Sequence, residues 1–187
     1  MSIFAVSASL PAVPLAVAEP IEAVSGLRVL RSDASGVLLE LATPDYALVP
    51  IQADGHAFES LSVVGLNLTA EAGQPQLPMA SALLGVPPDA TVTVRVMADD
   101  GQLLSGRHDL IPAASPVPLM DELQSGQTRR TVDAKAYAGT AAYPALMARL
   151  ADDAWLRDQR LVRVEMYPFQ YRPRDRQVIW HRTLRVE

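Results

Sequence analysis

The chain has 187 residues, enough for one sizeable domain; 49% are hydrophobic and only 20% are charged, which excludes global disorder. Its lack of cysteine excludes disulfides, thiolate metal sites and a cysteine nucleophile within this sequence. The formal net charge is −5, and the C-terminal arginines alternate with apolar residues as on a solvated sheet face, so we expect no nucleic-acid partner. Because aromatic residues are scarce, we expect Trp155, Trp180 and Phe169 to anchor an aliphatic core.

Residues 1–20 form an apolar leader that ends in Ala16-Val17-Ala18, the small-x-small form of a signal-peptidase site. No basic residue precedes the apolar run, and two prolines interrupt it. Two interpretations stay open, a signal-peptide remnant or a flexible apolar leader. We favour the first, which predicts a secreted or cell-surface protein. At about 16 residues the run is too short to be a membrane span.

Residues 21–187 are predicted to form an all-β domain, an antiparallel β-sandwich of jelly-roll or Ig-like type. Strand-like segments alternate with turns about every ten residues, which is typical of such sandwiches. Asp54-Gly55 and Asp100-Gly101 are expected hairpin turns, and PFQYRPRD is expected to close a last hairpin. The expected strands are residues 27–30, 37–41, 46–52, 58–65, 91–97, 102–110, 161–167 and 177–186.

Two segments depart from this pattern. Residues 112–142 are rich in Pro, Ala, Ser, Gly and Thr without periodicity, which predicts a long loop that is functional or disordered. In 143–155, a proline at a first-turn position and apolar residues at helical spacing predict one short α-helix. We expect the pair Asp152-Asp153 to lie on the solvated face of that helix.

No catalytic, metal-binding or cofactor-binding motif is found in the sequence. The three histidines, His56, His108 and His181, are expected at the surface or in turns. His108 and Asp109 are neighbours on an expected strand, so they point to opposite faces and form no dyad. Neither a Gly-rich phosphate loop nor a G-x-S-x-G elbow is present. The chain is therefore expected to be no enzyme and to carry no cofactor.

Two stretches, EAGQPQLPM at 71–79 and LLGVPPDATVTVRV at 83–96, resemble the propeptide domain of gingipain-type cysteine peptidases of family C25. In the C-terminal half, Tyr143-Pro144, residues 155–157 and the PFQYRP turn at 168–173 are similar to later elements of that family. The shared residues of the first theme are Gly73, Pro75, Leu77, Pro78, Val86, Pro87, Asp89, Ala90, Val92, Val94 and Val96.

The resemblance implies a secreted zymogen's prodomain, bacterial in origin, that assists folding of a catalytic domain in cis and covers its active-site cleft. In arginine-specific members an arginine on a prodomain loop fills the specificity pocket. The candidates for that role here are Arg129 and Arg130, in the 112–142 loop. A guanidinium suits such a role because its fork can pair bidentately with a carboxylate. A solvated dibasic pair or a processing site is the alternative interpretation.

Tyr167, Phe169 and Tyr171 raise a different function. Their period of two places them on one face, as a carbohydrate-binding sandwich displays aromatic rings. The alternative structural role is to close one end of the core around a proline turn. The runner-up function is therefore an extracellular binding module, for glycan or protein, without a protease partner.

Overall fold

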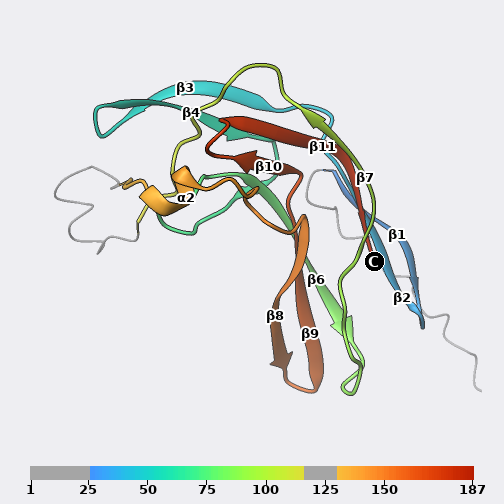
Figure 1. Cartoon of the computed structure of the whole chain (residues 1–187). Helices are drawn as coiled ribbons and strands as arrows, with labels where there is room; N and C mark the ends of the chain where they lie inside the picture. The colour runs from blue at the N-terminus through green and yellow to red at the C-terminus, as the bar shows by residue number, and fades with distance from the viewer. Residues whose placement is uncertain (1–25, 116–129) are drawn as a thin grey trace, which may run out of the picture.

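Antiparallel β-strands make up nearly all of the regular structure (Figure 1). The computed structural model describes residues 26–115 and 130–187, and the leader at 1–20 lies outside these ranges. The predicted all-β fold with one short helix is confirmed. Its elements are β1 Leu27–Asp33, β2 Gly36–Ala42, β3 Ala47–Ala53, β4 His56–Ser62, β5 Asn67–Leu68, β6 Pro78–Val86, β7 Val96–Leu103, α2 Ala134–Ala138, β8 Ala148–Leu156, β9 Gln159–Met166, β10 Phe169–Arg172 and β11 Gln177–Val186.

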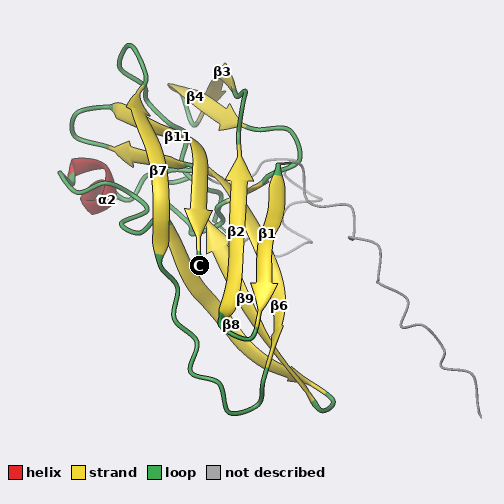
Figure 2. Cartoon of the chain, turned by 90° about the vertical axis from the view of Figure 1, so that its right-hand side faces the viewer, coloured by secondary structure: helices red, strands yellow, loops and turns green. Residues whose placement is uncertain are grey.

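Two larger sheets form the body of the molecule (Figure 2). In the first, β11 is central: β10 and β2 pair with successive halves of one edge, and β7 pairs with the other edge. The second sheet has the order β5-β6-β9-β8. β3 and β4 form a separate hairpin, and the predicted hairpins β1–β2 and β3–β4 are both confirmed.

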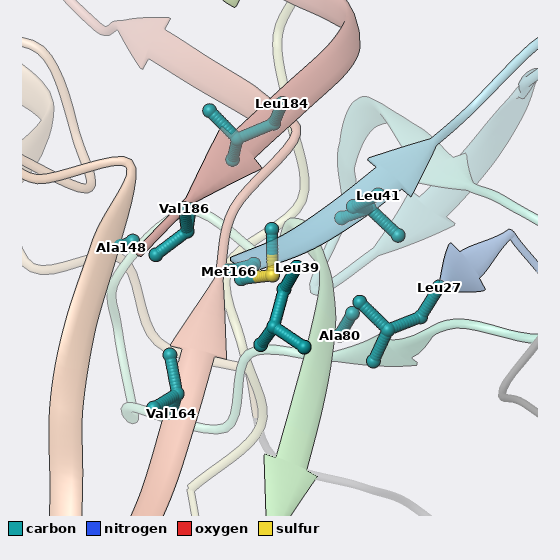
Figure 3. Close-up of a cluster of buried hydrophobic side chains, with 9 residues drawn as sticks. All are labelled: Leu27, Leu39, Leu41, Ala80, Ala148, Val164, Met166, Leu184 and Val186. Carbon is teal, nitrogen blue, oxygen red and sulfur yellow. The ribbon is translucent and has the colours of Figure 1, made fainter. Parts of the chain in front are cut away.

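The core lies between the two large sheets, which confirms the sandwich. In the larger cluster, leucines and valines of β2 and β11 face Ala80 of β6 and Val164 and Met166 of β9 (Figure 3). A second cluster contains Leu61, Leu77, Leu110, Phe169, Tyr171 and Val178. This cluster lies close to both ends of the 112–142 segment, because Leu110 belongs to it and Tyr143 packs against it.

The helix predicted at 143–155 is wrong. Residues 148–156 form β8, which pairs with β9 throughout, and the one short helix of the described chain lies earlier, at Ala134–Ala138. Asp152 and Asp153 form cross-strand ion pairs with arginines of β9 instead of lying on a helix face. Trp155, expected in the core, is 56% exposed. The apolar residues of 143–155 recur at helical spacing by coincidence. Most of the segment is a strand, β8, whose partner is the next strand, β9.

The hairpin predicted at Asp100-Gly101 is also wrong, because β7 runs through both residues as a single strand. A Cβ on Gly101 would lie 2.7 Å from Cε1 of His181. The glycine therefore permits close packing against β11 and makes no turn. The last predicted hairpin is corrected in its pairing: β10, not β9, pairs with β11, and β9 belongs to the other sheet.

Candidate functional site

An extended segment between β5 and β6, residues 73–77, forms a platform for the chain on both sides of residues 116–129. On the upstream side it pairs with residues 111–113. The Gln76 amide donates to the Ile111 carbonyl at 2.9 Å, and the Ala113 amide donates to the Gln74 carbonyl at 2.8 Å. Both segments are buried along much of their length. We call this pairing, together with the contacts that residues 130–137 make with it, the loop base.

Gly73 holds both sides of the loop base. Its N–H donates to the Ala113 carbonyl at 3.1 Å, and its own carbonyl accepts from the Asp133 amide at 3.1 Å. Its φ of 80° lies in the left-handed region, which glycine adopts at little cost. A Cβ at this position would meet the Thr131 carbonyl oxygen at 3.1 Å. The position therefore requires glycine for its conformation and for the close approach of the downstream segment.

Arg130 connects the two sides through its side chain. Its Nη1 donates to the Pro112 carbonyl at 2.7 Å and to Oε1 of Gln76 at 3.2 Å. The side chain is half-buried, and its guanidinium lies against the loop base. Arg129, the other predicted site residue, lies outside the described residues, as do residues 116–128 of the predicted 112–142 loop.

The downstream side continues into α2, whose N-cap is Asp133. The Asp133 carboxylate accepts from the Lys135 amide at 2.8 Å, so the side chain satisfies a free N–H of the first turn. Tyr137 of α2 then donates its hydroxyl to the Leu110 carbonyl at 2.7 Å. Burial raises the pKa of Tyr137, so this hydroxyl stays protonated and keeps donating.

The upstream side is fixed by Tyr171 and His108. The Tyr171 hydroxyl donates to the His108 carbonyl at 2.7 Å, and burial raises the pKa of Tyr171 to about 12. Nδ1 of His108 lies 2.9 Å from Oε2 of Glu59, and Nε2 lies 3.1 Å from the Ser105 carbonyl. The strand that enters the loop base is thus bonded to β4 and β10.

The expectation that all three histidines lie at the surface or in turns is wrong for two of them. His56 is exposed beside a turn, but His108 is 9% exposed and His181 is 4% exposed. Nδ1 of His181 lies 3.1 Å from Asp99 of β7. Each buried histidine meets a carboxylate from another strand, and such long-range pairing leaves no local sequence signal. The prediction that His108 and Asp109 form no dyad is confirmed, since Asp109 pairs with Arg176.

The aromatic surface predicted from Tyr167, Phe169 and Tyr171 is wrong. Their exposed fractions are 3%, 0% and 1%. Phe169 stacks on Trp180 with ring centroids 6.3 Å apart, and Tyr171 packs edge-on against Tyr137. Because the chain has few aromatic residues, they close the core, as the alternative interpretation had it.

Residues 26–115 and 130–187 contain no group of three or more His, Asp or Glu side chains placed to hold a metal ion. In the same ranges, no helix is long and apolar enough to cross a membrane.

Sequence reasoning missed Gln76 and Tyr137 as parts of the loop base. The only available signal for Gln76 was its position within the Gly73–Pro78 motif.

Comparison with known proteins identifies a family and a shared fold. The sequence matches the protein family "Propeptide_C25" over residues 23–187, and a search of curated proteins finds no match. The complex of the RgpB pro- and mature domains from Porphyromonas gingivalis contains a chain similar at a TM-score of 0.77, with 19% identity, over 87% of this chain and 84% of that one. A structure on the zymogenic latency of gingipain K, from the same organism, is similar at a TM-score of 0.70, with 22% identity, over 86% of this chain and 90% of that one. At such identities the two structures show a shared fold.

Proposed function

The chain belongs to the C25 propeptide family, and from this premise we propose that the segment joining the two sides of the loop base holds the catalytic domain of its cognate peptidase inactive. The chain is a non-catalytic propeptide of a gingipain-like cysteine peptidase. The observation that carries the proposal is the loop base itself. Its hydrogen bonds to a buried platform fix the described residues on either side of 116–129, and anchored flanks of this kind favour a substrate-like inhibitor.

Arg129 is our candidate for the residue that enters the specificity pocket. Its guanidinium fork suits a pocket carboxylate, and it lies next to the loop base in sequence. Arg130, the second candidate from the sequence, has its guanidinium bonded to Pro112 and Gln76. The proposal therefore assigns the two arginines different positions and predicts a peptidase that cleaves after arginine.

The decisive measurement is inhibition of the cognate peptidase by the purified chain. A residue that fills a desolvated pocket typically contributes 2 kcal/mol or more, so Arg129→Ala should raise the inhibition constant by about 30-fold or more. Arg157→Ala, which changes an exposed arginine in the β8–β9 turn, is the matched control and should leave inhibition intact. Unchanged inhibition by Arg129→Ala, and by the Arg129→Ala/Arg130→Ala double variant, would refute the loop assignment.

The same premise leads us to propose three further properties. The chain acts in cis, in front of its peptidase; it covers the active-site cleft; and it assists folding of the catalytic domain in an exported precursor. Refolding of the catalytic domain with and without this chain, scored by titrated active sites, tests the folding role. An equal yield in both cases would contradict it. The glycan-binding alternative is not proposed, because its aromatic residues are buried.

A further inference from the structure

We propose that Arg130 is a positioning residue, a clasp that closes the loop base, and that it does not itself enter the peptidase. This inference rests on the proposed function for its consequence in inhibition, but its structural part concerns the propeptide alone. Nη1 of Arg130 reaches the upstream side at the Pro112 carbonyl and the platform at Gln76. One side chain from the downstream side therefore contacts the other two segments of the loop base.

The pairing of two prolines explains why a clasp is needed at this place. Pro75 and Pro112 face each other, and the hydrogen bonds run between their neighbours, from Gln76 to Ile111 and from Ala113 to Gln74. This is a non-hydrogen-bonded pair, in which the two facing residues form no backbone hydrogen bond with each other. Proline, which has no N–H, is therefore tolerated at both positions. In such a pair each carbonyl points away from the facing strand. The Pro112 carbonyl therefore needs a donor from elsewhere, and Arg130 supplies it.

The chemistry of the contact favours arginine. Pro112 is buried, and a buried carbonyl without a donor carries a substantial free-energy cost. A charged donor gives a stronger hydrogen bond than a neutral one, and the two N–H groups of Nη1 can serve the carbonyl and the Gln76 amide oxygen together. The Gln76 backbone is itself bonded to Ile111, so its side chain extends from a fixed position. Arg130 and Gly73 thus hold the loop base from two sides, one by side chain and one by backbone.

A role as clasp excludes a simultaneous role in the peptidase pocket. A guanidinium that donates to Pro112 inside the propeptide would have to give up that bond to reach a pocket carboxylate on another domain. The loop base would then lose the side-chain contact between its downstream and upstream sides at Pro112, and only the Tyr137–Leu110 hydrogen bond would remain among the side-chain contacts described above. We therefore expect substitution of Arg130 to loosen the loop base first and to affect inhibition only as a consequence.

Hydrogen exchange of the isolated propeptide, followed by NMR, tests the clasp without any peptidase. Arg130→Gln should speed exchange of the Ala113 and Asp133 amides by about tenfold, the effect of losing one charge-assisted hydrogen bond. The Leu104 amide, which donates to Val178 in the sheet region, should not change. Gln76→Glu places a carboxylate beside the guanidinium and should slow exchange of the same two amides, but only when Arg130 is present. Unchanged exchange at both amides in Arg130→Gln overturns the proposal.

Inhibition assays separate this inference from the proposed function. If both hold, Arg129→Ala removes most inhibition, Arg130→Gln weakens it by no more than about tenfold, and Gln76→Glu does not weaken it. If Arg130→Gln removes inhibition as fully as Arg129→Ala while exchange stays unchanged, Arg130 is the pocket residue and the clasp is refuted. If exchange rises in Arg130→Gln but neither arginine variant affects inhibition, the clasp stands and the proposed inhibitory loop is refuted.

Discussion

Substitution of Gly73 offers the sharpest stability test of the loop base. In Gly73→Ala the new residue must adopt a φ of 80°, which costs about 1–2 kcal/mol for a residue with a Cβ. The Cβ would also lie 3.1 Å from the Thr131 carbonyl oxygen and 3.2 Å from the Asp133 backbone nitrogen. Moving that segment away weakens the Asp133–Gly73 hydrogen bond, which adds about 0.5–1.5 kcal/mol. The expected loss of unfolding free energy is therefore about 1.5–3.5 kcal/mol.

The chain provides a matched control in Gly55, in the β3–β4 turn. Its φ is 78°, and a Cβ there would meet no atom within 4 Å. Gly55→Ala thus carries the same backbone strain and the same unfolded-state effect without the contact, and should cost about 1–2 kcal/mol. Urea unfolding followed by tryptophan fluorescence measures both variants. Indistinguishable losses for the two would refute the reasoning, because the contact with the downstream segment would then contribute nothing.

Three further predictions test other parts of the fold. Hydrogen bonds from the arginines of β11 and β1 hold the pKa of Glu40 below its usual range. The Glu40 carboxylate therefore stabilises the fold above its unfolded pKa, and this stability is lost as the pH falls through the folded pKa. In Glu40→Gln, unfolding experiments across pH should show a smaller loss of unfolding free energy on acidification. His108→Ala should cost about 1–3 kcal/mol in urea unfolding, and a double-mutant cycle with Glu59→Ala should show coupling, whereas additivity would contradict the pairing. Trp155→Ala should change the unfolding free energy by no more than about 0.5 kcal/mol, while Phe169→Ala should cost about 3–5 kcal/mol; the reverse order would contradict the burial pattern.

Two elements whose partner is the adjacent segment, the hairpins β1–β2 and β3–β4, were predictable from sequence because their turns carry clear turn residues. The turn at Asp54-Gly55 is one example: both residues have positive φ, at 49° and 78°, and they join β3 to β4 as the pair predicts. The same reasoning failed at Gly101, because the cause there is His181, eighty residues later. Local spacing also failed at β8, where strand pairing and ion pairs with β9 outweigh a helical pattern. A single sequence shows turn chemistry but does not show which distant strand will face a residue.

In the candidate site, too, local features were predictable from sequence and long-range contacts were not. Sequence resemblance brought Arg130 into consideration, but its position against Pro112 depends on a pairing across many residues, which no local pattern displays. The predicted aromatic face failed because period two places residues on one side of a strand without saying whether that side meets solvent or core. In this chain that side meets the core at Tyr167, Phe169 and Tyr171, whereas Trp155 is exposed although aromatic residues are few.

The Gly73–Pro78 motif connects the family resemblance to the function in physical terms. Gly73 forms backbone hydrogen bonds with both sides of the loop base. Proline is tolerated at position 75 because the pairing with Pro112 requires no N–H there, and Leu77 is fully buried in the second core cluster. Each of these residue types meets a demand of the platform and none performs chemistry. A propeptide in which only the joining segment changed could therefore present different residues to different peptidases. The family resemblance is therefore carried by the residues of the platform, and our proposal assigns specificity to the chain between residues 115 and 130.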